Sequence, residues 1–201
     1  MIPKIVNSIQ DNLLACFPTE TVYALVCNTL STETIEKIYQ IKKRSQNKPF
    51  SIFVNDIYSL MEVAEVKEEY IDLINHFSPG PITYILPLKN NHILPNKHFK
   101  ESIGIRIPDH PVALSILNEL KIPIISTSMN ISGEKSVSKA SDIPQSIKQH
   151  LSIVVEDDKL VSGIESTIID LATDKVRILR DGAISLQTIN NVLANLNLHL
   201  A

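Results

Sequence analysis

The sequence is short of positive charge and of aromatic residues, and each shortage argues against a class of nucleic-acid binder. Its 201 residues include 19 Lys and Arg against 22 Asp and Glu, which gives a formal net charge of −3. A dedicated nucleic-acid-binding domain is usually basic. Aromatic residues make up only 5% of the chain, whereas single-strand binders stack bases on exposed rings. Contact with RNA through a local patch nevertheless stays open.

Long hydrophobic segments are also missing. No apolar run approaches the roughly 18 residues that a membrane-spanning helix needs. The N-terminal segment, MIPKIVNSIQDN, lacks the basic region and the apolar core of a signal peptide. We therefore expect a soluble, cytoplasmic protein that does not bind a membrane.

Cysteine is scarce as well. Cys16 and Cys27 lie in apolar stretches and have no metal-ligand spacing with other Cys or His. We expect both to be small, buried thiols in a reducing compartment. The six histidines are scattered, and each is expected at the surface or in a structural role. The sequence thus assigns no metal ligands.

The common motifs of nucleotide binding and catalysis are absent too. The chain has no Walker loop (GxxxxGK[ST]), no GxGxxG, no HExxH and no nucleophile elbow. A chemical function, if present, must therefore come from a less familiar arrangement of polar residues and not from an obvious nucleophile.

Apolar residues alternate between helical and strand periods along the chain, which favours an α/β fold. The 201 residues are expected to form a single domain, residues 1–201. Two pairs of neighbouring strand patterns have no helix between them, one near 82–88 and 103–107 and the other near 167–171 and 176–179. They favour antiparallel pairs and hence a mixed sheet. Helices are expected over 2–9, 31–44, 57–63, 70–77, 111–120 and after Ser185. Ser31 is expected to start the second of these helices and Ser185 to cap the last. Strands are expected over 13–17, 49–54, 82–88, 103–107, 122–127, 153–155, 167–171 and 176–179.

Three polar clusters lie beside predicted strands. FPTETVYAL (residues 17–25) places two hydroxyls and a carboxylate where a simple turn would favour Gly, Asn or Asp. STSMNISG (126–133) follows an apolar strand, at the kind of strand end where open α/β sheets bind ligands. A loop that bonds its own backbone is an equal alternative for this second cluster. ESTIIDL (165–171) again opens a strand with hydroxyls.

Three of the four arginines fall in similar clusters. Arg44 lies in IKKRSQNKP, Arg106 in SIGIRIPDHP and Arg180 in ILRDGAI. Arginine is preferred for forked contacts to carboxylate or phosphate. These positions therefore indicate anion binding, although a surface ion pair with Asp109 is an alternative for Arg106.

The densest basic stretch contains Lys42, Lys43, Arg44 and Lys48. It fits a phosphate clamp. It fits equally well a solvated helix end, because cations are favoured at the C-terminal end of the helix dipole.

Taken in order, seven stretches resemble the YrdC-like family, the threonylcarbamoyl-AMP synthases, in its short single-domain form. The stretches, which lie between about residues 17 and 184, are FPTETVYAL, IKKRSQNKPF, SPGPITYILP, SIGIRIPDHP, PIISTSMNISG, ESTIIDL and ILRDGAI. The resemblance implies a twisted, open, mixed α/β sheet with flanking helices and a concave basic groove.

The resemblance also implies a nucleotidyltransferase. Such an enzyme joins L-threonine, bicarbonate and ATP, with Mg²⁺ accompanying ATP, into threonylcarbamoyl-adenylate and pyrophosphate. A separate transferase complex then uses the adenylate to modify adenosine 37 of tRNA, and a weak contact with tRNA or double-stranded RNA stays open. Positioning and charge neutralisation can supply most of this catalysis, which fits the missing nucleophile. The alternatives are a non-catalytic RNA-binding module and a carbamoyl-transfer domain.

The resemblance assigns roles position by position. It implies that Lys42 and Arg44 are catalytic. The residues implied to bind threonine are Thr19, Thr21, Arg106 and Ser166. The residues implied to bind ATP are Lys42, Arg44, Lys48, Ser102, Ser126, Ser128, Asn130, Ser136 and Arg180.

Four positions depart from the family's usual pattern. Ala24 and Val26 stand where Gly is usual, and we expect them to narrow the groove, because glycine permits close backbone approach. Ser45 replaces a usual Pro. Met129 replaces a usual Ala and is expected to add bulk inside the nucleotide loop.

Overall fold

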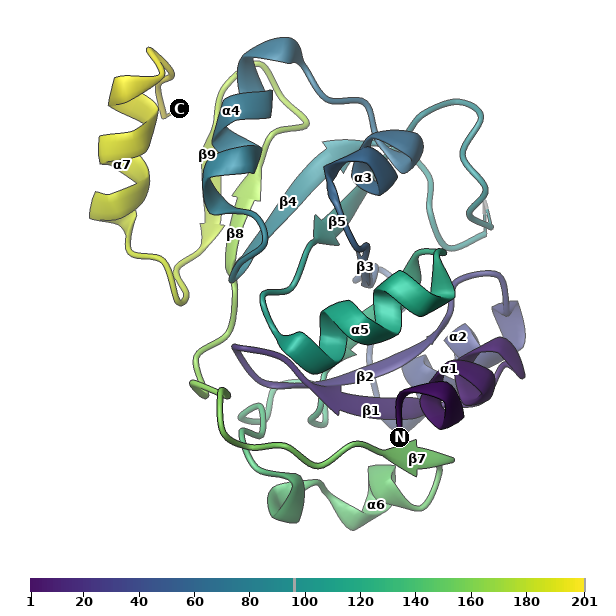
Figure 1. Ribbon diagram of the computed structural model, residues 1–201. Coiled ribbons are helices and arrows are strands. Elements are labelled where there is room, and N and C mark those ends of the chain that lie inside the picture. Colours follow the sequence, from purple (N-terminus) through teal and green to yellow (C-terminus); the bar gives the residue numbers. More distant parts are fainter. Residues whose placement is uncertain (96, 201) are drawn as a thin grey trace.

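A mixed, twisted sheet of nine strands runs through the part of the chain that the computed structural model describes, residues 1–95 and 97–200 (Figure 1). Its strand order is β7-β1-β2-β6-β3-β5-β4-β8-β9. The strands are β1 (Ala15–Pro18), β2 (Tyr23–Asn28), β3 (Ser51–Phe53), β4 (Ile82–Pro87), β5 (Ser102–Arg106), β6 (Ile124–Ser128), β7 (Ile153–Val154), β8 (Thr167–Asp170) and β9 (Arg177–Arg180).

The pairing of the strands confirms the predicted mixed sheet. β4 runs antiparallel to β5, with Ile85 opposite Gly104, and β8 runs antiparallel to β9. β3 is parallel to β5, and β4 is parallel to β8. In each of these two antiparallel pairs the strands follow one another without a helix between them, as the sequence indicated. The pairs β1–β2, β2–β6 and β3–β6 are antiparallel as well.

Helices flank the sheet, also as predicted. They are α1 (Ile2–Gln10), α2 (Thr32–Ile41), α3 (Ile57–Val63), α4 (Glu68–Phe77), α5 (Pro111–Leu120), α6 (Gln145–Lys148) and α7 (Leu186–Asn195), with a short 3-10 helix over Ala140–Asp142. The predicted caps of α2 and α7 are confirmed, because Ser31 accepts a hydrogen bond from the Thr34 N–H and Ser185 accepts one from the Thr188 N–H.

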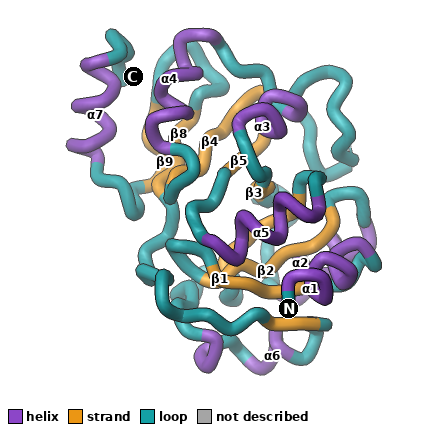
Figure 2. Tube along the Cα trace, viewed as in Figure 1, coloured by secondary structure: helices purple, strands orange, loops and turns teal. Residues whose placement is uncertain are grey.

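The core consists of two hydrophobic clusters. The smaller cluster joins α1 and α5, which lie side by side next to β1 and β2 (Figure 2). Ile5 and Ile9 of α1 are spaced one helical turn apart and are fully buried there. The larger cluster contains side chains of α2, α3, α4 and α7. Burying an aliphatic side chain of this size stabilises the fold by about 1.5–3 kcal/mol. Both clusters therefore stabilise the packing of helices against the sheet.

Two strand predictions need correction. β2 was expected only as an apolar segment, because YALVCN is a continuous apolar run that lacks the alternation of a half-buried strand; all but Asn28 is buried. β6 begins at Ile124, later than the predicted residue 122. Pro123 has no backbone N–H to donate to a neighbouring strand.

The predicted buried thiols are confirmed. Cys16 and Cys27 are free and fully buried, and burial raises the pKa of both well above the usual range. Among the described residues, no helix combines the length and the apolar character that crossing a membrane requires.

Candidate functional site

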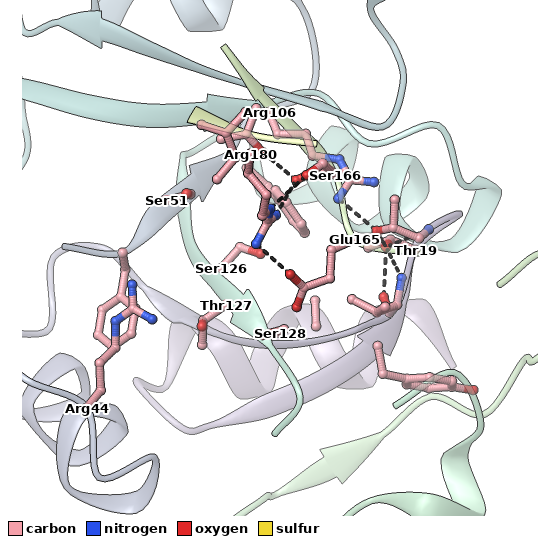
Figure 3. A pocket seen from close by; sticks show the side chains of 18 residues that line it. Thr19, Arg44, Ser51, Arg106, Ser126, Thr127, Ser128, Glu165, Ser166 and Arg180 are labelled. Carbon is pink, nitrogen blue, oxygen red and sulfur yellow. Dashed lines mark hydrogen bonds and ion pairs between the residues drawn. The ribbon is translucent and has the colours of Figure 1, made fainter. Parts of the chain in front are cut away.

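Polar residues from neighbouring strands converge on a cavity of about 150 Å³ (Figure 3). Its lining follows the sheet in order from β2 through β6, β3, β5, β4 and β8 to β9, so the cavity lies across the middle of one face. The lining residues are Thr19, Thr21, Val22, Tyr23, Ala24, Arg44, Phe50, Ser51, Phe53, Thr83, Arg106, Ser126, Thr127, Ser128, Glu165, Ser166, Ile168 and Arg180.

The turn between β1 and β2 is held by hydroxyl groups. Thr19 Oγ1 donates to the Val22 carbonyl oxygen over 2.7 Å and lies 2.8 Å from Thr21 Oγ1. Arg106 Nη1 donates to Thr21 Oγ1 over 2.9 Å. Because Thr21 Oγ1 accepts from this guanidinium, its own proton is free for Thr19 Oγ1. The two hydroxyls of PTET therefore stabilise the turn and link it to Arg106.

Arg106 is a buried cation with a partly buried partner. Its Nη2 lies 2.6 Å from Glu20 Oε1, and its Nε donates to the Gly80 carbonyl over 3.1 Å. The alternative of a surface pair with Asp109 is thus wrong. Burial lowers the pKa of Arg106 while Glu20 acts to raise it, and a guanidinium stays charged in proteins. Glu20 is explained as the counter-ion that permits this burial.

Arg180 and Glu165 belong to a second hydrogen-bonded group in the cavity lining. Arg180 Nη1 donates to Glu165 Oε2 over 2.6 Å, and its Nε and Nη2 donate to Ser166 over 3.0 Å each. Ser136 Oγ donates to Glu165 Oε1. Thr83 Oγ1 lies 2.9 Å from Ser166 Oγ. This network orders hydroxyl, carboxylate and guanidinium groups at the start of β8.

Arg44 lies apart from this network, on the far side of the cavity (Figure 3). Its Nε and Nη2 donate to the carbonyls of Lys48 and Pro49 over 2.9 Å each, and its guanidinium carbon is 5.0 Å from the Phe50 ring centroid. These contacts hold the side chain against its own loop. Burial lowers the pKa of Arg44, and the guanidinium remains a fixed charge facing the cavity.

Lys42 is buried behind the cavity wall. Its Nζ donates to the carbonyl oxygens of Ser128 and Asn130 over 2.5 and 2.6 Å, and to Asn130 Oδ1 over 2.9 Å. Burial lowers the pKa of Lys42 to about 7. The side chain therefore ties the end of α2 to the STSMNISG segment.

The structure brings together eight of the thirteen predicted site residues at the cavity surface. The residues that line it are Thr19, Thr21, Arg44, Arg106, Ser126, Ser128, Ser166 and Arg180. The residues outside its lining are Lys42, Lys48, Ser102, Asn130 and Ser136.

Those five outlying residues have different surroundings. Asn130 and Ser136 contact the lining residues Ser128 and Glu165, respectively. Lys48 is exposed, and only its backbone carbonyl meets Arg44. Ser102 lines a separate hollow together with Lys97 and Lys100.

Several lining residues were missed by the sequence analysis. Glu165 belongs to a cluster that we noted, but it received no role. Thr83 is the polar residue in the buried strand ITYILP, and this isolated hydroxyl was an available signal. Phe50 and Phe53 carried no signal, because phenylalanine beside an apolar strand is typical of a core.

The departures from the family pattern have unequal consequences. Ala24 lines the cavity, whereas Val26 and Met129 do not. Met129 is fully buried in the larger hydrophobic cluster. The bulk of Met129 therefore lies in the core and not in the cavity.

The cavity combines three guanidinium groups with a rim of hydroxyls, which suits an anionic ligand with several oxygens. The described residues contain no group of three or more His, Cys, Asp or Glu side chains that could hold a metal ion.

Comparison with known proteins places this geometry in context. Residues 7–182 match the family model Sua5_yciO_yrdC, described as "Telomere recombination". The chain is 34% identical to the threonylcarbamoyl-AMP synthase of Bacillus subtilis over 187 residues, 92% of this chain and 54% of that protein. It is 37% identical over 170 residues to a putative threonylcarbamoyl-AMP synthase of Methanocaldococcus jannaschii, covering 84% of this chain and 79% of that protein. The chain thus spans about half the length of the Bacillus relative.

Solved structures share the fold. Pyrococcus abyssi Sua5 complexed with L-threonine matches with a TM-score of 0.90 and 29% identity, over 100% of this chain and 58% of that one. Escherichia coli YciO matches with a TM-score of 0.85 over 94% of this chain and 92% of that one, and its 23% identity supports the fold alone.

Proposed function

This chain belongs to the Sua5/YciO/YrdC family, and from that membership we propose that it is a threonylcarbamoyl-AMP synthase. In this proposal it converts L-threonine, bicarbonate and ATP into threonylcarbamoyl-adenylate and pyrophosphate. A tRNA threonylcarbamoyl-transferase complex in the cytoplasm would take up the adenylate.

The observation that carries the proposal is the cavity itself. Arg44 from the loop after α2, Arg106 from β5 and Arg180 from β9 line it, together with the hydroxyl groups of neighbouring Thr and Ser residues. A relative with the same fold was solved with L-threonine bound. The non-catalytic RNA-binding alternative is not favoured, because similar proteins carry the name of the synthase.

The reaction needs charge neutralisation more than covalent help. An unprotonated threonine amine reacts with bicarbonate to give a carbamate and water. The carbamate oxygen then attacks the α-phosphorus of ATP and displaces pyrophosphate. ATP, bicarbonate and the threonine carboxylate are all anions. Fixed guanidinium groups in a partly closed cavity stabilise the charge that develops around the α-phosphorus and on the leaving pyrophosphate.

We assign the roles accordingly. Arg106, with Thr19 and Thr21 beside it, is proposed to bind the threonine carboxylate. Arg44 and Arg180 are proposed to bind the ATP phosphates. Mg²⁺ is proposed to arrive with ATP, because phosphate oxygens are among its preferred ligands.

The residues behind the cavity take supporting roles. Lys42 and Asn130 hold the segment that carries Ser126 and Ser128, so we propose that they act on ATP by fixing this segment. Ser166 is bonded to Arg180 and is retained as a threonine contact. We also keep Lys48, Ser102 and Ser136 as proposed ATP contacts. Because these residues lie outside the cavity lining, ATP would have to extend beyond the cavity rim to reach them.

The test is release of pyrophosphate from ATP, measured with all three substrates and with each omitted in turn. We expect release only when L-threonine and bicarbonate are both present. Arg180→Ala removes a guanidinium from the cavity and should lower the rate by about 100-fold or more. Release that does not depend on threonine, or no release at all, would overturn the proposal.

Arg177→Ala is the matched control. Arg177 lies on the same strand, β9, but pairs with Asp170 and does not line the cavity. It removes the same charge from the chain, so it should keep most of the activity. Equal losses in the two variants would show that the effect of Arg180→Ala comes from net charge or from damage to β9.

A further inference from the structure

The charges around the cavity are unbalanced in a way that points to one residue. Among the described residues, its lining contains three arginines and a single carboxylate, that of Glu165. Glu20 is paired with Arg106 and does not line the cavity. Of the residues that the structure describes, Glu165 thus supplies the one negative charge in the lining of this cavity.

The carboxylate of Glu165 is held in place by two hydrogen bonds and still has acceptor positions available. Its Oε2 accepts from Arg180 Nη1 over 2.6 Å, and its Oε1 accepts from Ser136 Oγ. An ionised carboxylate offers about four acceptor positions, so each oxygen can accept a further hydrogen bond. The side chain is 35% exposed, and Figure 3 shows it pointing into the cavity between Arg180 and Thr19.

The substrate of the proposed function has a matching need. L-Threonine enters as a zwitterion, with one carboxylate and one ammonium group. The arginines suit the carboxylate, but three guanidinium groups repel an ammonium group. Taking an ammonium group out of water is costly unless an opposite charge receives it. Glu165 meets this need from within the lining.

We propose that Glu165 binds the α-ammonium group of the substrate and thereby makes the cavity selective for α-amino acids over carboxylic acids that lack the amine. The identity of the amino acid rests on the proposed function above. The contact is non-covalent and is made with the protonated amine as threonine enters. The ammonium group must release its proton to solvent before the amine reacts with bicarbonate.

Glu165 could instead serve only to position Arg180. The variant Glu165→Gln distinguishes this positioning role from binding of the ammonium group. The amide oxygen still accepts from Arg180, and the amide nitrogen can donate to Ser136 Oγ, so both present contacts survive. Only the negative charge is lost. A positioning role therefore predicts little change in the variant, whereas an ammonium-binding role predicts weaker binding of amines alone.

The experiment compares two ligands by titration calorimetry: L-threonine and 3-hydroxybutyrate, which is threonine without its amine. We expect the wild type to prefer threonine. Glu165→Gln should raise the Kd of threonine by about 10- to 100-fold, the range expected for loss of a charge-assisted hydrogen bond. The Kd of 3-hydroxybutyrate should change by less than about two-fold, since that ligand never meets the charge.

The controls are two further variants. Glu156→Gln removes an exposed acid from outside the cavity lining and should bind like the wild type. Glu165→Asp keeps the charge and should keep part of the preference for the amine. It also gives a second measurement if Glu165→Gln fails to give a folded protein by circular dichroism.

Two results would overturn the inference while leaving the function intact. One is an unchanged threonine Kd in Glu165→Gln. The other is an equal loss for both ligands, which would mean a distorted cavity. In either case, threonine-dependent pyrophosphate release by the wild type would still support the synthase. A wild type that binds neither ligand and releases no pyrophosphate would overturn the proposed function together with this inference.

Discussion

Two lysines of one short basic stretch have opposite surroundings. Lys48 is exposed, whereas Lys42 is only 1% exposed and donates to three oxygens of the Ser128–Asn130 segment. The chain turns out of α2 at Lys43, whose φ of 51° is left-handed, and this turn leaves Lys42 on the inner side. Its ammonium group serves as an internal cross-link between α2 and the end of β6.

Lys42→Met is expected to lower the free energy of unfolding by about 1–3 kcal/mol. Methionine has a similar volume, so the change removes the donor and leaves three oxygens without it. The variant no longer has the desolvation cost of a buried ammonium group. The loss of the hydrogen bonds is nevertheless larger, because each buried acceptor without a donor costs free energy. Urea unfolding followed by circular dichroism measures the change.

Lys48→Met is the control for this prediction. It makes the same chemical change at an exposed position, where surface substitutions usually change stability by less than about 0.5 kcal/mol. Equal stabilities of the two variants would contradict the cross-link.

At the scale of elements, the strand end of β9 and the start of β8 form one unit. After Arg180, the chain passes against residues 165–167, where the Ala183 N–H donates to the Glu165 carbonyl over 2.9 Å. Gly182 sits at the closest point. A Cβ atom there would lie 2.5 Å from the Ser166 carbonyl carbon and from the Thr167 nitrogen. The glycine thus permits the approach that brings Arg180 to Glu165 and Ser166.

Gly182→Ala is expected to destabilise the protein by about 1–3 kcal/mol, as overpacking does. The atoms that meet the new methyl group are backbone atoms and cannot rotate away, so the two segments must separate. Chemical denaturation measures the loss. Under the proposed function, the KM for ATP should also rise, because Arg180 moves with this segment.

Asp181→Ala introduces alanine at the neighbouring, exposed position and serves as the comparison. It should leave both stability and KM nearly unchanged. If Gly182→Ala were as stable as Asp181→Ala, close packing of the two segments would not be what requires glycine.

For the whole molecule, the dependence of stability on pH has an identifiable source in His110. This residue is fully buried where β5 leads into α5, and its Nδ1 accepts from the Val112 N–H as the helix cap. Among the described residues, its Nε2 has no hydrogen-bond partner. Burial lowers the pKa of His110, while the carboxylates of Asp157, Glu20 and Asp109 act to raise it. Protonation of Nδ1 would also break the cap.

The protein is therefore expected to lose stability in mild acid. The folded-state pKa of His110 lies below the unfolded value of 6.5, so the unfolded chain binds the proton first. The contribution is complete above pH 6.5 and is lost as the pH falls from there through the folded pKa. Urea midpoints at about pH 7.5 and about pH 5.5 measure the loss.

His110→Asn isolates this contribution. Asparagine is a good N-cap residue, so it can keep the contact to Val112 but has no proton to gain. The variant should lose less stability between the two pH values than the wild type. Equal losses would assign the pH dependence to other groups.

The sequence predicted much of the fold because local patterns carry that information. Ser31 and Ser185 were expected as helix caps, and both accept the capping hydrogen bond. β2 was not predicted as a strand, because a continuous apolar run lacks the alternation of apolar and polar residues that indicates one. Near the site, the clusters around Thr19, Ser126 and Arg180 were found from unusual polar residues beside apolar strands.

What the sequence determined by itself was therefore the α/β class, the antiparallel neighbours and the polar strand ends, because these follow from spacing within a few residues. The tertiary structure alone decided which charges meet. It paired Arg106 with Glu20 instead of Asp109, turned Lys42 inward and left Glu165 facing the cavity. Such pairings depend on strand order and register across the sheet, and no local pattern encodes the distance between residues far apart in the chain.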